Sequence, residues 1–285
     1  MRRVPASLLR RCALIRHLAL AICLTTIIAA STTAQAVPFP VEEFDAHDRI
    51  ARALLAYDAC AWRSTDELMK QPRAARADVG RVWFCLPHGD DWDAIYGRSE
   101  PAADRYEIRF HFRVSRAGVT LSTEPLDTAR VHAAARALSA TLGDAPAAVT
   151  ASGIRFNPYV QFAGDSMVTV WLLPAWQPNG LAAFGAQVRD DYGGDGRRRE
   201  RRAVVEGPIL LARPDTSESF RIDSNSGDVA TVGDLFFMYL LRPYFAGIRI
   251  QTGRFSSQLV KAGDGYAWVH AVRAPPSSPP ARPEN

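Results

Sequence analysis

A strict alternation of apolar and polar residues over positions 106–115 is the sequence feature that most constrains the fold. Successive side chains of a strand point to opposite faces, so the pattern predicts a strand with one apolar and one polar face. A turn at 116–118 then leads into a second short strand at 119–122, which makes a hairpin. The apolar positions of the first strand are Tyr106, Ile108, Phe110, Phe112 and Val114.

Other segments extend this prediction to the whole chain. Strands are predicted at 81–86, 92–97, 155–162, 167–173, 183–190, 203–212, 247–254 and 266–273. Because several of them follow one another through tight turns, we expect mainly antiparallel pairing.

Helical periodicity occurs in three regions. Apolar residues recur at three- and four-residue steps over 50–62, and a capping pattern at 64–67 predicts a second short helix that ends before Pro72. Another amphipathic helix follows Asp127. A capping pattern at 231–234 precedes residues 235–241, for which we predict a short buried helix, with a strand as the alternative. The predicted fold class is α+β, a mainly antiparallel sheet with an N-terminal helical hairpin and one or two further helices.

Residues 1–36 have the pattern of a secretory signal peptide. Arginines precede an apolar run at about 18–30, and Ala34, Gln35 and Ala36 supply the small–x–small pattern that signal peptidase cuts. Cleavage would leave 29 basic and 30 acidic residues, because the segment holds five of the 34 basic residues and no acid. The net charge of the mature chain is then about −1, which does not predict nucleic acid as a partner.

We therefore expect an exported bacterial protein, periplasmic or secreted. The apolar run is shorter than the roughly 20 residues of a transmembrane helix, so no transmembrane segment is expected after signal removal. An uncleaved anchor, lipid attachment at Cys23 and a twin-arginine signal at Arg10 and Arg11 are the alternatives.

Residues 37–273 are expected to form a single α+β domain. The small residues at 144–153 mark where two lobes would divide, and the proline-rich residues 274–285 predict a disordered tail. Cys60 and Cys85 remain after signal removal, and in an oxidising compartment such a pair most simply forms a disulfide. Free thiols, or a thiol nucleophile with a histidine, are the alternative.

Two segments supply candidate ligand-binding residues beside the predicted hairpins. His88, Asp90, Asp91 and Asp93 place imidazole and carboxylate groups close together, as a divalent ion site would require. Asp and Gly also favour a turn, and the spacing matches no calcium loop, so the pattern favours a hairpin turn and predicts no metal or cofactor.

Cationic residues provide the other candidates for binding an anion. Arg109, His111 and Arg113 lie on the polar face of the strand at 106–115, which a solvated sheet face would also explain. The segment 190–202 has glycines and aspartates at the tip of a hairpin, followed by an arginine run. These arginines either bind an anionic ligand or pair with acids across the strands, and the candidates are Arg197, Arg198 and Arg199.

One short motif resembles a known enzyme family. Residues 164–167 look like the first block of GDSL-type esterases, in which the serine is the nucleophile. Those enzymes need a downstream Asp-x-x-His, whereas here His270 is the only histidine after Ser166 and residue 267 is alanine. The segment therefore favours an ordinary β-turn.

The sequence favours a non-catalytic binding protein of the cell envelope with a protein or glycan partner. The first alternative is a periplasmic hydrolase with a nonstandard site built from His88, Asp90, Asp91 or His111. The second is an inhibitor or immunity protein against an envelope-targeting toxin. Six tryptophans lie in the mature chain, and an exposed pair would indicate stacking on carbohydrate.

Overall fold

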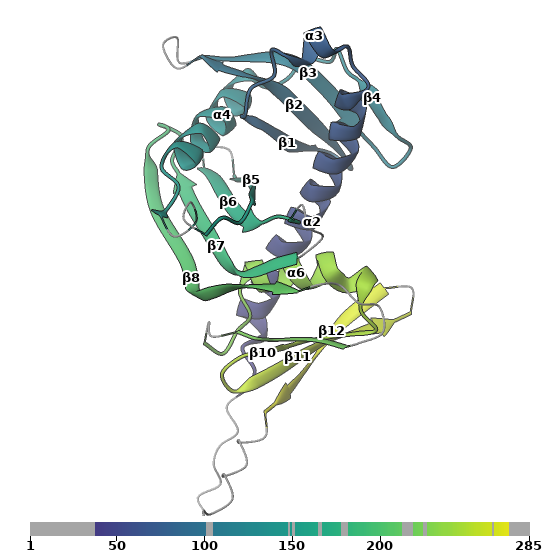
Figure 1. The fold of residues 1–285 in the computed structure, drawn as a ribbon, viewed down its shortest axis with the longest axis vertical. Coiled ribbons are helices and arrows are strands. Elements are labelled where there is room, and N and C mark those ends of the chain that lie inside the picture. The colour runs from purple at the N-terminus through teal and green to yellow at the C-terminus, as the bar shows by residue number, and fades with distance from the viewer. Residues whose placement is uncertain are drawn as a thin grey trace, which may run out of the picture. The chain divides into compact units, whose positions relative to one another are not determined.

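The computed structural model describes residues 38–100, 105–147, 149, 152–164, 167–177, 182–212, 219–224, 227–263 and 265–273. The predicted signal peptide, the proline-rich tail and the pair Asp165 and Ser166 lie outside the described residues. From Pro40 onward the described residues belong to one compact unit, in which helices pack on three four-stranded sheets (Figure 1). The predicted α+β class with a mainly antiparallel sheet is confirmed.

One continuous helix, α2 (Val41–Met69), forms most of the N-terminal region. The break predicted at Ser64 is wrong, because the Ser64 hydroxyl donates to the Cys60 carbonyl oxygen at 2.8 Å and so bonds back one turn within the same helix. A four-residue helix, α3 (Arg73–Arg76), follows Pro72. The N-terminal region thus consists of one long and one very short helix.

Sheet A is an antiparallel meander. Its strands in spatial order are β1 (Trp83–His88), β2 (Asp91–Glu100), β3 (Arg105–Val114) and β4 (Val119–Leu121). A two-residue turn joins β1 to β2, and Gly89 has a φ of 58° there, which favours glycine. The predicted strand at 106–115 is confirmed as β3, and Phe112 of its apolar face is fully buried.

Helix α4 (Thr128–Gly143) begins where the sequence predicts it. The Asp127 carboxylate accepts hydrogen bonds from the backbone N–H groups of Ala129 and Arg130 at 3.0 and 3.2 Å, which is an N-cap. Sheet B is a second antiparallel meander, and α4 contacts it through β6. Its strands are β5 (Phe156–Ala163), β6 (Met167–Pro174), β7 (Ala182–Tyr192) and β8 (Arg198–Ala212).

Sheet C mixes parallel and antiparallel pairing. In spatial order its strands are β12 (Gly265–Val272), β11 (Phe255–Ala262), β10 (Gly247–Gln251) and β9 (Ser219–Asp223). The parallel pair β9 and β10 is joined through α6 (Val232–Leu241) and the 3₁₀ turn η2 (Arg242–Tyr244). The sequence did not predict β9 or β11.

Helix α6 confirms the helix predicted for residues 235–241. The Thr231 hydroxyl accepts a hydrogen bond from the Asp234 backbone N–H at 3.1 Å, and the Asp234 carboxylate accepts one from the Thr231 N–H at 3.0 Å. This reciprocal pair is the capping box. It sets the start of α6 and hence the position of the side chains that α6 and η2 present.

Helix α2 packs against sheet C near its start and against sheet A further along (Figure 1). Near its start, the Phe44 ring meets Trp268 of β12 edge-on, with centroids 5.5 Å apart. Further along, Tyr57 meets Trp92 of β2 in the same manner at 5.9 Å. Within the part of the chain that the structure describes, no helix combines the length and the apolar composition needed to cross a bilayer.

Candidate functional site

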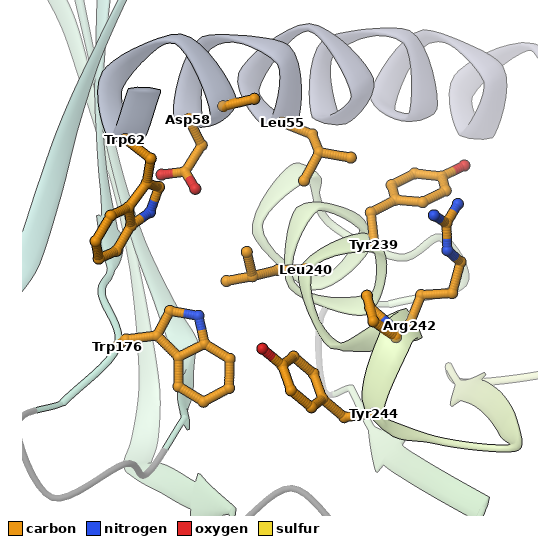
Figure 2. Close-up of a pocket in the computed structure, with 10 residues that line it drawn as sticks. Leu55, Asp58, Trp62, Trp176, Tyr239, Leu240, Arg242 and Tyr244 are labelled. Atoms are coloured by element: carbon orange, nitrogen blue, oxygen red, sulfur yellow. The ribbon is translucent and has the colours of Figure 1, made fainter. Parts of the chain in front are cut away.

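A cleft lies between α2, α6 with η2, and the segment that follows β6 (Figure 2). Its volume is about 840 Å³, which falls within the usual range for small-molecule sites, about 300–1,000 Å³. We call it the aromatic cleft. It is lined by Leu55, Asp58, Ala59, Trp62, Trp176, Tyr239, Leu240, Arg242, Pro243 and Tyr244.

The helical repeat places four residues of α2 in one wall of the cleft. Leu55, Asp58, Ala59 and Trp62 follow one another at three- and four-residue steps, so they share one face of the helix. The sequence assigned Trp62 to the apolar stripe that packs in the core, but its side chain is 57% exposed. The stripe of α2 is therefore wider than core packing requires, and its extra residues line the cleft.

Trp176 and Tyr244 form the opposite wall. Their rings meet edge-on with centroids 5.5 Å apart, and Tyr244 is 41% exposed whereas Trp176 is half-buried. The backbone beside Trp176 is held by a hydrogen bond from the Ala175 N–H to the Arg155 carbonyl oxygen at 2.8 Å. Figure 2 shows the Trp62 indole beside Asp58 on α2 and the Trp176 indole facing them from the opposite wall.

Asp58 is the acidic group in the α2 wall of the cleft, beside Trp62. Its side chain is 6% exposed, and its Oδ1 accepts a hydrogen bond from the Tyr159 hydroxyl at 2.8 Å. Burial raises the pKa of Asp58, against the opposing effect of hydrogen bonds from Tyr159 and Trp62. The cleft thus contains a carboxyl group in a largely apolar setting, where a hydrogen bond to a ligand hydroxyl is strong.

A partly buried polar cluster joins α2 to α6 and β12 beside the cleft. Tyr239 of α6 donates a short hydrogen bond from its hydroxyl to Asp48 of α2. Trp268 of β12 donates from Nε1 to the same Asp48 oxygen at 3.0 Å, and Arg52 Nε donates to the other oxygen at 2.7 Å. Burial, followed by the bond to Asp48, raises the pKa of Tyr239. The cluster holds the two helices that form the cleft at a fixed separation.

Four of the residues predicted as ligand-binding meet elsewhere, on the polar face of sheet A. Asp93 lies 2.7 Å from His111 Nε2, 3.0 Å from Arg113 Nε and 3.2 Å from His88 Nδ1. Burial works to raise the pKa of Asp93, but the hydrogen bond from His111 and the nearby charges outweigh it and lower that pKa. On this face of β3, His111 is buried, Arg113 is partly exposed and Arg109 is exposed, so the face is solvated only in part.

The remaining candidates of this segment stay apart from that cluster. Asp90 is an exposed turn residue, Asp91 begins β2, and Arg109 pairs with Glu107 at 3.1 Å and with Asp78 at 3.6 Å. Across the described residues, no three His, Cys, Asp or Glu side chains are arranged to hold a metal ion. The Asp93 carboxylate is already paired with three cationic or titratable groups, which is the arrangement of a structural network.

The arginines at the start of β8 form ion pairs with nearby acidic side chains. Arg198 lies 2.7 Å from the Asp144 carboxylate after α4, and Arg199 lies 2.7 Å from Asp195 in the turn. Arg201 forms a two-pronged pair with the fully buried Asp190, at 2.7 and 2.6 Å. The Arg201–Asp190 pair crosses from β8 to β7, as one of the two sequence interpretations expects, whereas Asp144 and Asp195 lie outside these strands. Arg197 is exposed at the start of this run, with its backbone N–H bonded to Asp195.

Cys60 of α2 and Cys85 of β1 are both buried, and both are free thiols in the structure. Burial raises the pKa of Cys85, and a hydrogen bond with the Cys60 thiol raises it further. The structure contains no disulfide between these two cysteines, so the predicted bond stays a prediction.

The sequence did not single out the residues of the aromatic cleft. The signal that could have found them is the combination of Asp58 and Trp62 within an apolar stripe, because an acid is rarely placed in a core-facing stripe without a role. Comparison of the chain with protein-family models, with curated proteins and with solved structures finds no match.

Proposed function

We propose that this chain is an exported, non-catalytic binding protein of the bacterial cell envelope, and that the aromatic cleft binds a glycan. The observation that carries the proposal is that Trp62 and Trp176 line one cavity from different segments, with Asp58 beside Trp62 on α2. A pyranose ring has a flat apolar C–H face and an edge of hydroxyl groups. An indole offers apolar surface to the face, and a carboxylate accepts hydrogen bonds from the edge.

Two further features support a glycan over a core or interface role for these aromatics. The exposed fractions of Trp62 and Tyr244 leave apolar surface in contact with water, which a monomeric protein rarely gathers in one place without a ligand. The predicted export of the chain would bring it to the compartment in which envelope glycans are found.

Binding is favoured over cleavage by the composition of the cleft. Most glycosidases place two carboxyl groups on either side of the scissile bond. Among the described residues that line the cleft, Asp58 is the only carboxylate. Asp58 already accepts hydrogen bonds from Tyr159 and Trp62, and a carboxylate has further lone pairs with which to accept a ligand hydroxyl.

The test is co-sedimentation of the purified mature protein with peptidoglycan sacculi. Trp62→Ala should weaken binding roughly 30-fold, because an exposed tryptophan in a binding centre commonly contributes 2 kcal/mol or more. Leu121→Ala is the control, since Leu121 is 59% exposed on β4 and does not line the cleft. Wild-type protein that stays in the supernatant, or a Trp62→Ala variant that sediments like wild type, would refute the proposal.

We also propose that export converts the Cys60 and Cys85 thiols into a disulfide. Their direct interaction and their burial support a bond that would tie α2 to β1. Closing a loop of about 24 residues would stabilise the fold by roughly 3 kcal/mol. Thiol titration of denatured periplasmic protein should find no free thiol before reduction and two afterwards, and equal counts would exclude the bond.

A further inference from the structure

Arg242 gives the aromatic cleft one cationic group. It follows the last turn of α6 and precedes Pro243, so its position is set by the end of the helix. Its guanidinium carbon lies 4.3 Å from the centre of the Tyr266 ring, which holds the side chain by a cation–π contact. Figure 2 shows Arg242 beside Tyr239, across Leu240 from the two tryptophans.

Arg242 differs from neighbouring arginines in having no acidic partner among the described residues. Arg52, which also lies near Tyr239, is paired with Asp48 at 2.7 Å, and Arg254 of the same half of the chain is paired with Asp228. Among the residues that the structure describes, no carboxylate lies within ion-pair distance of Arg242. An arginine that lines a cavity with its planar donors unpaired is suited to binding a carboxylate or a phosphate.

The two sides of the cleft therefore have different chemistry. The side with Trp62 and Trp176 offers apolar ring surface and the Asp58 acceptor, whereas the side with Arg242 offers donors and a positive charge. We infer that the cleft selects a saccharide that carries a carboxylate, with a sugar ring at the tryptophans and the carboxylate at Arg242. This inference rests on the proposed function and specifies the class of glycan.

A carboxylate on a saccharide can have two sources. It can be the lactyl ether of N-acetylmuramic acid in peptidoglycan, or the C6 carboxylate of a uronic acid. Both would meet Arg242 in the same way, since a guanidinium recognises the planar carboxylate and not its attachment. The length of the attachment differs between them, so affinity for each can separate the two.

The experiment measures binding of three defined tetrasaccharides to the full mature protein by isothermal titration calorimetry. The neutral probe is an N-acetylglucosamine tetramer, the second probe alternates N-acetylglucosamine with N-acetylmuramic acid, and the third is a galacturonic acid tetramer. At least one acidic probe should bind about tenfold more tightly than the neutral one, because a charge-assisted pair contributes at least that factor.

Arg242→Gln should lower the affinity for the preferred acidic probe about tenfold and so remove its preference over the neutral probe. Arg249→Gln is the matched control, because Arg249 is exposed on β10 and lies outside the cleft. Circular dichroism confirms that each variant is folded, and the comparison of probes on wild-type protein does not depend on any variant.

The outcomes separate the inference from the proposed function. Equal affinity of wild-type protein for the neutral and acidic probes would overturn the inference and leave glycan binding intact. Binding of none of the three would overturn both. An acid preference that persists in Arg242→Gln would also overturn the assignment, because the carboxylate would then be recognised elsewhere.

Discussion

The hydrogen bond between Tyr159 and Asp58 gives the sharpest test of the energetics of the cleft. Tyr159→Phe removes the hydroxyl that donates to Asp58 at 2.8 Å and changes nothing else of the ring. Both residues are almost fully buried, so water does not readily replace the lost donor. A hydrogen bond to a charged group contributes about 1.5–3 kcal/mol, and we expect a loss of that size in the free energy of unfolding at pH 7.

The size of this loss should depend on pH. Burial raises the folded-state pKa of Asp58 above its ordinary value of 3.8, so the folded chain holds the proton more tightly than the unfolded chain. At pH 3.5 the carboxyl group is therefore largely protonated, and the bond joins two neutral groups worth about 0.5–1.5 kcal/mol. As the pH rises through the folded-state pKa, the carboxylate forms and the bond from Tyr159 strengthens.

Urea denaturation of wild type and Tyr159→Phe at pH 3.5 and pH 7 measures both values. Tyr106→Phe is the matched control, because the buried Tyr106 hydroxyl donates to the neutral carbonyl oxygen of Val82, also at 2.8 Å. Its cost should be about 1 kcal/mol at both pH values. If the cost of Tyr159→Phe is the same at both pH values, Asp58 is not the ionised partner and the reasoning fails.

Two further predictions concern sheet A. Because the pKa of Asp93 is lowered in the folded state, its stabilising effect is complete above the ordinary value of 3.8 and is lost as the pH falls through the folded-state pKa. Asp93→Asn should therefore lower the free energy of unfolding by about 3 kcal/mol at pH 7, because the buried His111 and the adjacent Arg113 lose their charged partner. Urea denaturation should find a smaller loss near pH 3, and a constant loss would contradict this. Gly97→Ala would place a Cβ 2.1 Å from the Glu107 carbonyl oxygen and should lower the free energy of unfolding by about 3 kcal/mol. A Cβ at Gly118 meets nothing within 4 Å, so Gly118→Ala is the control and should leave stability nearly unchanged. Equal melting temperatures of these two variants would show that the β2–β3 contact is more compliant than the structure indicates.

Local signals allowed much of the fold to be predicted from the sequence. The Asp127 cap and the capping box of Thr231 and Asp234 involve residues only two or three positions apart. Their sequence patterns are therefore sufficient to predict where the two helices begin. The alternation in β3 is equally local. The break predicted at Ser64 failed because a hydroxyl can bond back to the preceding turn as readily as it can cap a new one.

The strands that were missed depend on contacts distant in the sequence. In β11, Ser257 occupies a buried position and bonds to His270 of β12 at 2.9 Å, which interrupts the apolar alternation that marks a strand. Strand β9 is short, and its parallel pairing with β10 forms only after the chain has returned through α6. Such pairing leaves little trace in a single sequence, because each strand alone has few apolar positions.

The sequence could have drawn attention to Asp58 and Trp62, but it could not predict how the cleft is assembled. Trp62, Trp176 and Arg242 lie on three segments that meet only because α2 packs against α6 and sheet B in the folded chain. Their spacing is set by the cluster at Asp48, where Tyr239 and Trp268 both donate to one carboxylate. A ligand that enters a cleft already held open loses less free energy to ordering side chains and helices than one that must assemble its site. Loosening this cluster should therefore weaken binding even though Asp48 does not line the cleft, which distinguishes a preformed site from one that the ligand creates.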